Sequence, residues 1–239
     1  MIFVGLDDTD TLDHPGTNQL ARHLVALVRE RFCGTLITRH QLLDDPRVPY
    51  TSRNGSAAIL FEPVHGGSAA ELAELLRPAI LEWCPAGSDP GFCVAEEVPP
   101  EVVAWGRRCQ TDLVTQREAL ELAGRLGIML EGLGGTRDGV IGALAAIGLV
   151  STGNDGRVIH LGTAERDLYD VSGLQTIEGL TRYGVAETRV LASSSVVRRG
   201  RVDVGKRLRP NYRDGKAVLF VQLAAEAAAD DVWQAVRVV

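Results

Sequence analysis

The stretch Ile2–Asp10 reads IFVGLDDTD, and it sets the start of the fold. Its first five residues form a short apolar run, which predicts a buried strand. Three carboxylates follow within four residues, at Asp7, Asp8 and Asp10. Carboxylates held this close together repel one another unless a positive charge lies among them. A divalent metal meets that need, and Mg²⁺ in particular binds carboxylate oxygens and bridges to phosphate. The other interpretation is an exposed acidic turn, where aspartate is common.

The next candidate is the segment PGTNQ at residues 15–19, which meets a predicted helix over Gln19–Arg31. Backbone N–H groups at the start of a helix favour an anion, so Gly16 is a candidate phosphate-binding residue. Thr17 has two interpretations. Its side chain could cap the helix, or its hydroxyl could contact a phosphate or a metal.

Further along the chain, predicted strands alternate with predicted helices. The strands are expected at Gly34–Leu43, Ser56–Glu62, Phe92–Ala95, Val158–Leu161, Thr188–Ala192 and Ala217–Leu223. The helices are expected from the Ser68 cap to Trp83 and at Val102–Arg107, Thr115–Leu126, Val140–Leu149 and Ala224–Val236. This alternation predicts an α+β (mixed α/β) fold with two lobes. A change in sequence texture places the lobes at residues 1–164 and 165–239.

A glycine-rich segment, GLGGTRDG at residues 132–139, precedes the most apolar predicted helix. Glycine lets the backbone approach a ligand closely, and the following helix adds positive potential. The segment lacks the G-K-[ST] ending of a Walker A motif. Its candidate nucleotide-binding residues are Gly134, Gly135, Thr136, Arg137 and Gly139. The alternative is a turn that only allows the apolar helix to pack.

Two other segments carry candidate substrate-binding residues. In the loop PYTSRNG at residues 49–55, Arg53 and Asn54 could hold a phosphate or a substrate, although a hairpin turn at Asn54-Gly55 explains the same residues. The segment Arg189–Arg213 holds eight basic residues and one acidic residue, a net charge of +7 that leaves −13 for the remainder. Arg207 and Arg209 are its candidate contacts to a polyanion, and Tyr212 could stack on a base. The alternative is that these arginines pair with the acidic remainder.

Composition excludes several classes. The 239 residues carry a net charge of −6, which excludes a protein that is cationic over its whole surface. No apolar run reaches the ~18 residues of a membrane span, and the N-terminus shows no secretory signal. The four cysteines have no C-x-x-C spacing, so no zinc site is indicated. A cytoplasmic protein that does not bind membranes is expected.

Three of these motifs, in this order, resemble those of the tRNA(Ile) 2-agmatinylcytidine synthetase family. The first is VGLDDTD at residues 4–10, followed by Gly16 and Thr17. The second is VPYTSRNGSA at residues 48–57, and the third is GVIGALAAIG at residues 139–148. The resemblance implies a kinase-like N-terminal lobe that uses ATP and Mg²⁺, and a ferredoxin-like C-terminal lobe. The family activates the C2 carbonyl of a tRNA cytidine with ATP and condenses it with agmatine.

Carried onto this chain, the resemblance gives Asp7, Asp8 and Asp10 the metal and phosphate role. Thr17 falls where the family has a threonine that accepts phosphate, and residues 134–139 would line the nucleotide phosphates. The chain departs from the family at Asn18, where the family has a second threonine. It also lacks one glycine after Arg53 and has Asp138 where the family has a basic residue. Nothing in it resembles the family's OB-type tRNA-binding domain or zinc ribbon.

The expected protein is therefore an ATP- and Mg²⁺-dependent enzyme of the phosphotransfer or ligase type. Its acceptor would be an oxygen of RNA, such as a cytidine carbonyl, or of a related small molecule, with an amine as the second substrate. Its expected partners are a nucleotide, RNA or a small amine, and either a second copy of the chain or a separate RNA-binding subunit. The alternative is a non-catalytic nucleotide- or RNA-binding module, or a degenerate paralogue of the family.

Overall fold

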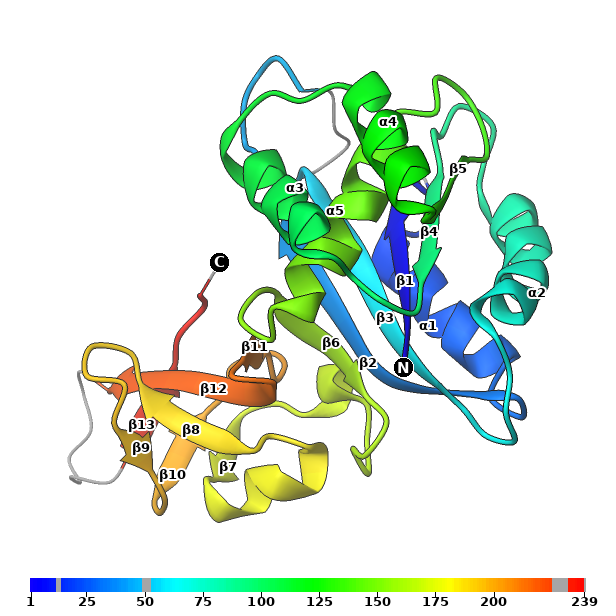
Figure 1. Cartoon of the computed structure of the whole chain (residues 1–239). Helices are drawn as coiled ribbons and strands as arrows, with labels where there is room; N and C mark the ends of the chain where they lie inside the picture. Colours follow the sequence, from blue (N-terminus) through cyan, green and yellow to red (C-terminus); the bar gives the residue numbers. More distant parts are fainter. Residues whose placement is uncertain (12–13, 49–52, 225–231, 239) are drawn as a thin grey trace. The chain divides into compact units, whose positions relative to one another are not determined.

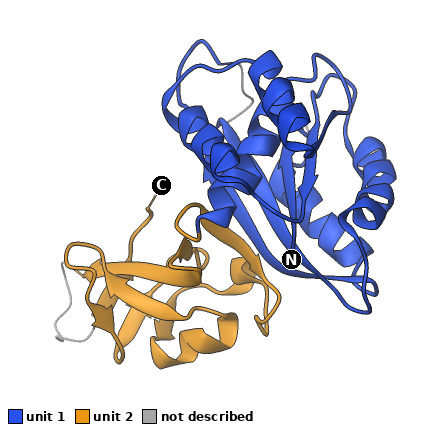
Figure 2. Cartoon of the chain, in the orientation of Figure 1, with its two compact units in different colours: residues 1–152 blue, residues 153–239 orange. Residues whose placement is uncertain are grey.

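The computed structural model describes residues 1–11, 14–48, 53–224 and 232–238. They form two compact units, Met1–Thr152 and Gly153–Val239, coloured blue and orange in Figure 2. Together they have the mixed α/β class with two lobes that the sequence predicts. The division between the units falls after Thr152, whereas the sequence places it after residue 164.

Unit 1 is built on an antiparallel sheet with the order β5-β4-β1-β3-β2. Helices α1 and α2 contact one face of this sheet, and α5 packs on the other face with α3 and α4 behind it (Figure 1). The central strand is the opening apolar run, which pairs on both sides. The elements are β1 (Ile2–Asp7), α1 (Thr17–Leu27), β2 (Phe32–Gln41), β3 (Gly55–Pro63), α2 (Ala69–Trp83), β4 (Gly91–Ala95), α3 (Pro100–Thr111), α4 (Gln116–Leu126), β5 (Met129–Gly132) and α5 (Val140–Ser151).

Local sequence signals explain most helix boundaries in unit 1. Ser68 caps α2 by accepting a hydrogen bond from the N–H of Glu71 at 3.2 Å, as predicted. Thr115 and Glu118 form a reciprocal capping box on α4, and Gly127 ends that helix in the left-handed conformation. Helix α5 is buried over nearly all its length, which explains why its sequence is apolar on every side. No helix among the described residues is long and apolar enough to cross a membrane.

The described part of unit 2 consists of strands and two short 3-10 helices. Its strands have the order β6-β11-β12-β13-β10-β7, and β8 pairs with β12 and β9. This part has no α-helix, whereas a ferredoxin-like lobe has helices on its sheet. The elements are β6 (Arg157–Leu161), η1 (Leu168–Asp170), β7 (Leu174–Thr176), η2 (Glu178–Tyr183), β8 (Glu187–Val190), β9 (Val196–Val197), β10 (Arg201–Asp203), β11 (Asn211–Arg213), β12 (Lys216–Leu223) and β13 (Val232–Ala235).

The helix predicted over Ala224–Val236 is wrong where the structure describes it. Val232–Ala235 form β13, which pairs with β12 and β10, so strand pairing overrides the helical propensity of this segment. The other part of that prediction, residues 225–231, lies outside the described residues.

Candidate active site

The end of β1 brings the predicted carboxylate Asp7 to the face of the sheet that α5 covers. Alternation along the strand puts Gly5 and Asp7 on this face. A Cβ at Gly5 would overlap the Ala143 carbonyl of α5, and a Cβ at Gly142 would overlap the Asp7 carboxylate. Glycine at positions 5 and 142 therefore lets the helix approach so closely that Asp7 lies directly against its backbone.

The backbone takes a left-handed conformation at Asp8. Its φ is +51°, in the left-handed region that aspartate and asparagine tolerate better than most residues. The Asp8 carbonyl accepts a hydrogen bond from the N–H of Asp89 at 3.1 Å, and the Asp89 carbonyl accepts one from Gly139 at 3.1 Å. These two bonds join the end of β1, the segment before β4 and the start of α5, so the carboxylates stand on a fixed backbone.

The charged forms of Asp7 and Asp8 are unfavourable at the end of β1. Burial and then repulsion by Asp8 raise the pKa of Asp7 to about 7. Burial raises the pKa of Asp8 to about 6, with further repulsion from Asp89, Asp10 and Asp138. Arg39 is a cation that opposes the shift at Asp7, but it has the smaller effect. The site thus concentrates negative charge, and a bound cation would relieve it.

Thr17 is the first residue of α1 and is not its cap. Gly16 holds the N-cap position, and no side chain caps the helix. The Thr17 hydroxyl oxygen instead accepts a hydrogen bond from the buried Thr9 hydroxyl at 3.1 Å. Asp10 lies at the same helix start, because its Oδ2 would be 3.1 Å from a Cβ on Gly16. Thr9, which sequence reasoning missed, therefore orients the hydroxyl of Thr17.

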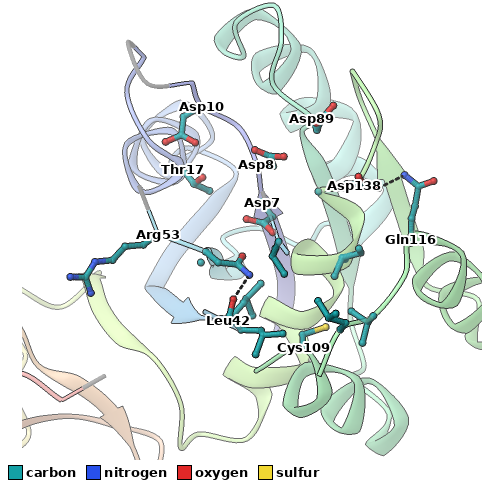
Figure 3. Close-up of a pocket in the computed structure, with 18 of the residues that line it drawn as sticks. Asp7, Asp8, Asp10, Thr17, Leu42, Arg53, Asp89, Cys109, Gln116 and Asp138 are labelled. Carbon is teal, nitrogen blue, oxygen red and sulfur yellow. Dashed lines mark hydrogen bonds between the residues drawn. The ribbon is translucent and has the colours of Figure 1, made fainter. Parts of the chain in front are cut away.

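A cavity of about 1010 Å³ in unit 1 joins these elements. Figure 3 shows Asp7 and Asp8 between the Asp10–Thr17 pair on one side and Asp89 with Asp138 on the other. Arg53 extends away from these carboxylates in the same view. The predicted residues that line the cavity are Asp7, Asp8, Asp10, Gly16, Thr17, Arg53, Asn54 and Gly139.

The glycine-rich segment contributes less of this lining than its sequence predicts. Only Asp138 and Gly139 of residues 132–139 line the cavity, so Gly134, Gly135, Thr136 and Arg137 lie outside its lining. The N–H of Thr136 donates to the Asp89 carboxylate, and that of Arg137 donates to the Gly134 carbonyl at 3.0 Å. The segment is thus folded on its own hydrogen bonds and on Asp89.

The loop between β2 and β3 places Arg53 and Asn54 at the cavity in different ways. The side-chain amide of Asn54 donates to the Leu43 carbonyl at 2.8 Å, and the Asn54 carbonyl accepts from the N–H of Leu42 at 3.0 Å. Asn54 therefore closes the base of the loop, and Gly55 already belongs to β3, so these two residues do not form a hairpin turn. Residues 49–52 of the motif lie outside the described residues.

The predicted contacts Arg207 and Arg209 belong to unit 2 and do not line this cavity. The guanidinium of Arg207 lies over the ring of Tyr169, 4.6 Å from its centroid. Arg189, from the same basic segment, pairs with Glu187 and Asp214. For Arg189, the alternative interpretation is therefore correct: this arginine pairs with acidic residues outside the basic segment.

Several cavity residues carried no sequence signal. Asp89 follows a turn-rich stretch, Arg39 lies within β2, and Gln116 begins α4, so only the tertiary fold brings them to Asp7 and Asp8. The Gln116 amide donates to the Thr136 carbonyl at 2.7 Å and to Asp138 at 3.2 Å, which ties α4 to the segment before α5.

Within the described ranges, no three His, Cys, Asp or Glu side chains converge as metal ligands. Asp10 stands apart from Asp7 and Asp8, beside the start of α1 (Figure 3). Mg²⁺ does not need such a convergence, because it is usually held by one or two carboxylates together with water and substrate phosphate. The half-buried, mutually repelling pair Asp7 and Asp8 fits that donor set.

Comparison with known proteins gives matches among solved structures. A tRNA fluorescent labeling enzyme is 29% identical with a TM-score of 0.55, over 62% of this chain and 35% of that chain. Apo TiaS, a tRNAIle2 agmatidine synthetase, is 27% identical with a TM-score of 0.54 over the same shares. The TiaS–tRNA(Ile2)–ATP complex is 25% identical with a TM-score of 0.54, over 62% of this chain and 36% of that chain.

The matched region is about a third of the length of each of those structures. No family model matches the sequence, and no curated protein does.

Proposed function

We propose that this chain, which is TiaS-like and holds part of the TiaS domains, takes part in an ATP-dependent modification of tRNA. Solved TiaS structures with tRNA(Ile2) and ATP support this proposal, because the chain shares their fold over 62% of its length. The nucleotide, the RNA and an amine are then its substrates.

One observation carries the proposal: a single cavity holds both Asp7–Asp8 and the Gly16–Thr17 helix start. Phosphoryl transfer asks little covalent chemistry of the protein and depends on positioning and charge neutralisation. The start of α1 offers N–H groups and positive potential to a phosphate. The carboxylates offer the opposite charge to a cation that accompanies the nucleotide. Thr17, whose hydroxyl is oriented by Thr9, lies between the start of α1 and the carboxylates.

Asp7 and Asp8 would hold Mg²⁺, and Gly16 and Thr17 at the start of α1 would contact the nucleotide phosphate. When bound, Mg²⁺ neutralises phosphate charge and aligns the phosphate for attack. Arg39 stands close enough to act on Asp7 and limits the accumulated negative charge. These roles follow from the donor chemistry of the residues and from their common cavity.

The proposed reaction has two steps. The acceptor oxygen of a tRNA cytidine takes a phosphoryl group from ATP and releases ADP, or takes an adenylyl group and releases pyrophosphate. An amine then attacks the activated carbon, and the oxygen leaves with the phosphate or AMP. In the first step Thr17 would contact the transferred group.

The test is thermal stabilisation by ATP with Mg²⁺ in the wild type and in Asp8→Asn. Asparagine accepts the left-handed backbone of position 8, so this change removes charge without forcing a new conformation. A ligand at 100 times its dissociation constant stabilises the native state by ~2.7 kcal/mol. We expect a Mg²⁺-dependent rise in melting temperature in the wild type that Asp8→Asn loses.

The matched control is Asp170→Asn, which removes the same charge from an exposed position in unit 2 and should keep the full shift. An equal shift in the wild type and in Asp8→Asn would contradict the role of Asp8. The absence of any shift in the wild type would overturn the ATP-dependent function and favour a module that binds RNA without catalysis.

A further inference from the structure

Unit 2 gathers arginines from separate segments of the chain around one buried asparagine. Arg157 of β6 lies opposite Asn211 of β11 in the strand register, and the N–H of Val158 donates to the Pro210 carbonyl at 2.8 Å. Asn211 is buried, and its amide donates to the Val238 carbonyl at 3.2 Å. These contacts place Arg157, Arg209 and Arg237 next to the same junction, although residues 157 and 237 are eighty positions apart.

A fourth arginine approaches from the loop before β11. The guanidinium of Arg207 lies over the Tyr169 ring, 4.6 Å from the centroid. A guanidinium that contacts an aromatic ring in this way can still donate N–H groups to an anion. Tyr169 is in the 3-10 helix η1, so a further segment of unit 2 holds this side chain in place.

The charges at this junction act on one another unfavourably. Burial, and then repulsion by Arg157, Arg237 and Arg207, lower the pKa of Arg209. Arg189 of the same unit is the contrast, because hydrogen bonds from its guanidinium to Asp214 and Glu187 raise its pKa. Carboxylates therefore surround the guanidinium of Arg189, whereas other guanidinium groups act on that of Arg209.

We propose that Arg157, Arg207, Arg209 and Arg237 form a phosphate-binding cluster that holds the phosphodiester backbone of RNA. The arginine fork matches phosphate oxygens in geometry, and several forks converging from three segments suit consecutive phosphates of one strand. Tyr169 keeps the fork of Arg207 in place and is a positioning residue. The choice of RNA as the source of the phosphates rests on the proposed function, whereas the phosphate chemistry rests on the cluster itself.

The experiment measures the affinity of the full chain for a labelled tRNA transcript by fluorescence anisotropy over a range of salt concentrations. The test variant is the double change Arg157→Ala and Arg209→Ala. We expect it to weaken binding at least tenfold at low salt. We also expect the slope of log affinity against log salt to fall by about one for each phosphate that the variant no longer neutralises.

The matched control is Arg198→Ala with Arg199→Ala, which removes the same charge from two exposed positions in the same unit. It should change the affinity less than threefold. A single change, Arg207→Lys, keeps the charge but loses the planar fork, and it should weaken binding by an intermediate amount. Circular dichroism melts of each variant identify any that fail to fold, and Arg207→Lys then serves as the conservative test.

Equal weakening by both double variants would overturn the cluster, because it would mean that only net charge matters. Unchanged binding by the test variant would overturn it as well. Stabilisation of the protein by inorganic phosphate through these residues, without tRNA binding, would overturn RNA as the ligand. The ATP-induced melting shift of unit 1 is measured on the same variants, so failure of this inference and failure of the proposed function give different results.

Discussion

At the scale of single residues, the site stores unfavourable charge that the fold does not relieve. Asp7 is held against the backbone of α5, and Asp8 takes a left-handed conformation, with hydrogen bonds through Asp89 fixing the turn. Residues held in this way cluster at functional sites, because stability alone would favour their removal. Replacing one of these carboxylates should therefore make the ligand-free protein more stable.

Asp7→Asn tests this argument through pH. An unfolded aspartate has a pKa near 3.8, and in the folded protein the pKa of Asp7 is raised to about 7. The folded state thus keeps a proton that the unfolded state has lost, so wild-type stability falls as pH rises from about 4 to about 7. Asparagine removes this loss. We expect Asp7→Asn to melt a few degrees above the wild type at pH 8 in EDTA, and close to it at pH 4.

The matched control for that comparison is again Asp170→Asn, which should follow the wild-type melting curve at both pH values. Equal melting temperatures of the wild type and Asp7→Asn at pH 8 would mean that Asp7 stays solvated. The charged Asp7 carboxylate would then not lower the stability of the folded protein.

At the scale of elements, the approach of α5 to β1 defines the geometry of the site. Glycine stands at each close contact, so Gly5 faces the Ala143 carbonyl, Gly91 faces Gly139, and Gly142 faces Asp7. The helix can therefore lie directly on the strand that carries the carboxylates. A methyl group at the third contact would separate the helix from Asp7 or turn the carboxylate away.

Gly142→Ala is the corresponding prediction. We expect a loss of stability of about 1–3 kcal/mol, because an added methyl overpacks a buried contact. We also expect the Mg²⁺-dependent ATP shift to disappear. The control is Gly124→Ala on α4, where a Cβ meets nothing within 4 Å. Alanine there should stabilise the protein by about 0.5–1 kcal/mol and leave the ATP shift intact. Retention of that shift in Gly142→Ala would show that Asp7 need not stay where α5 holds it.

Local patterns predicted β1, β2, β3, β4 and α5 closely, because a buried strand or helix has an apolar sequence whatever surrounds it. The same reasoning missed β5, a short edge strand, and misassigned β13, where pairing decides the conformation. The acidic cluster and Thr17 were also predicted, because each lies within a short motif of neighbouring residues. Asp89 and Arg39 were not, because their place at the cavity depends on which strands pair and on where α5 packs.

At the scale of the whole molecule, the cavity of unit 1 and the arginine cluster of unit 2 carry charges of opposite sign. Unit 1 concentrates carboxylates around a cavity, and unit 2 concentrates guanidinium groups around Asn211. An ATP–Mg²⁺ complex and an RNA strand are both polyanions, but ATP coordinates its Mg²⁺ directly, whereas RNA is surrounded by exchangeable counterions that arginine side chains displace. On the proposed function, the acidic cavity would therefore select the metal-bound nucleotide, and the arginine cluster would select the RNA backbone.

Hydrogen exchange tests this division on the intact chain. ATP with Mg²⁺ should slow exchange at the end of β1, in the first turn of α1 and at the start of α5, and should leave β6 and β11 unchanged. A tRNA transcript should slow exchange at β6 and β11, since both flank the arginine cluster. Slowing of equal size across both units with either ligand would contradict separate sites. If instead ATP protects unit 1 while tRNA protects neither strand, the nucleotide site stands and the RNA must be held elsewhere.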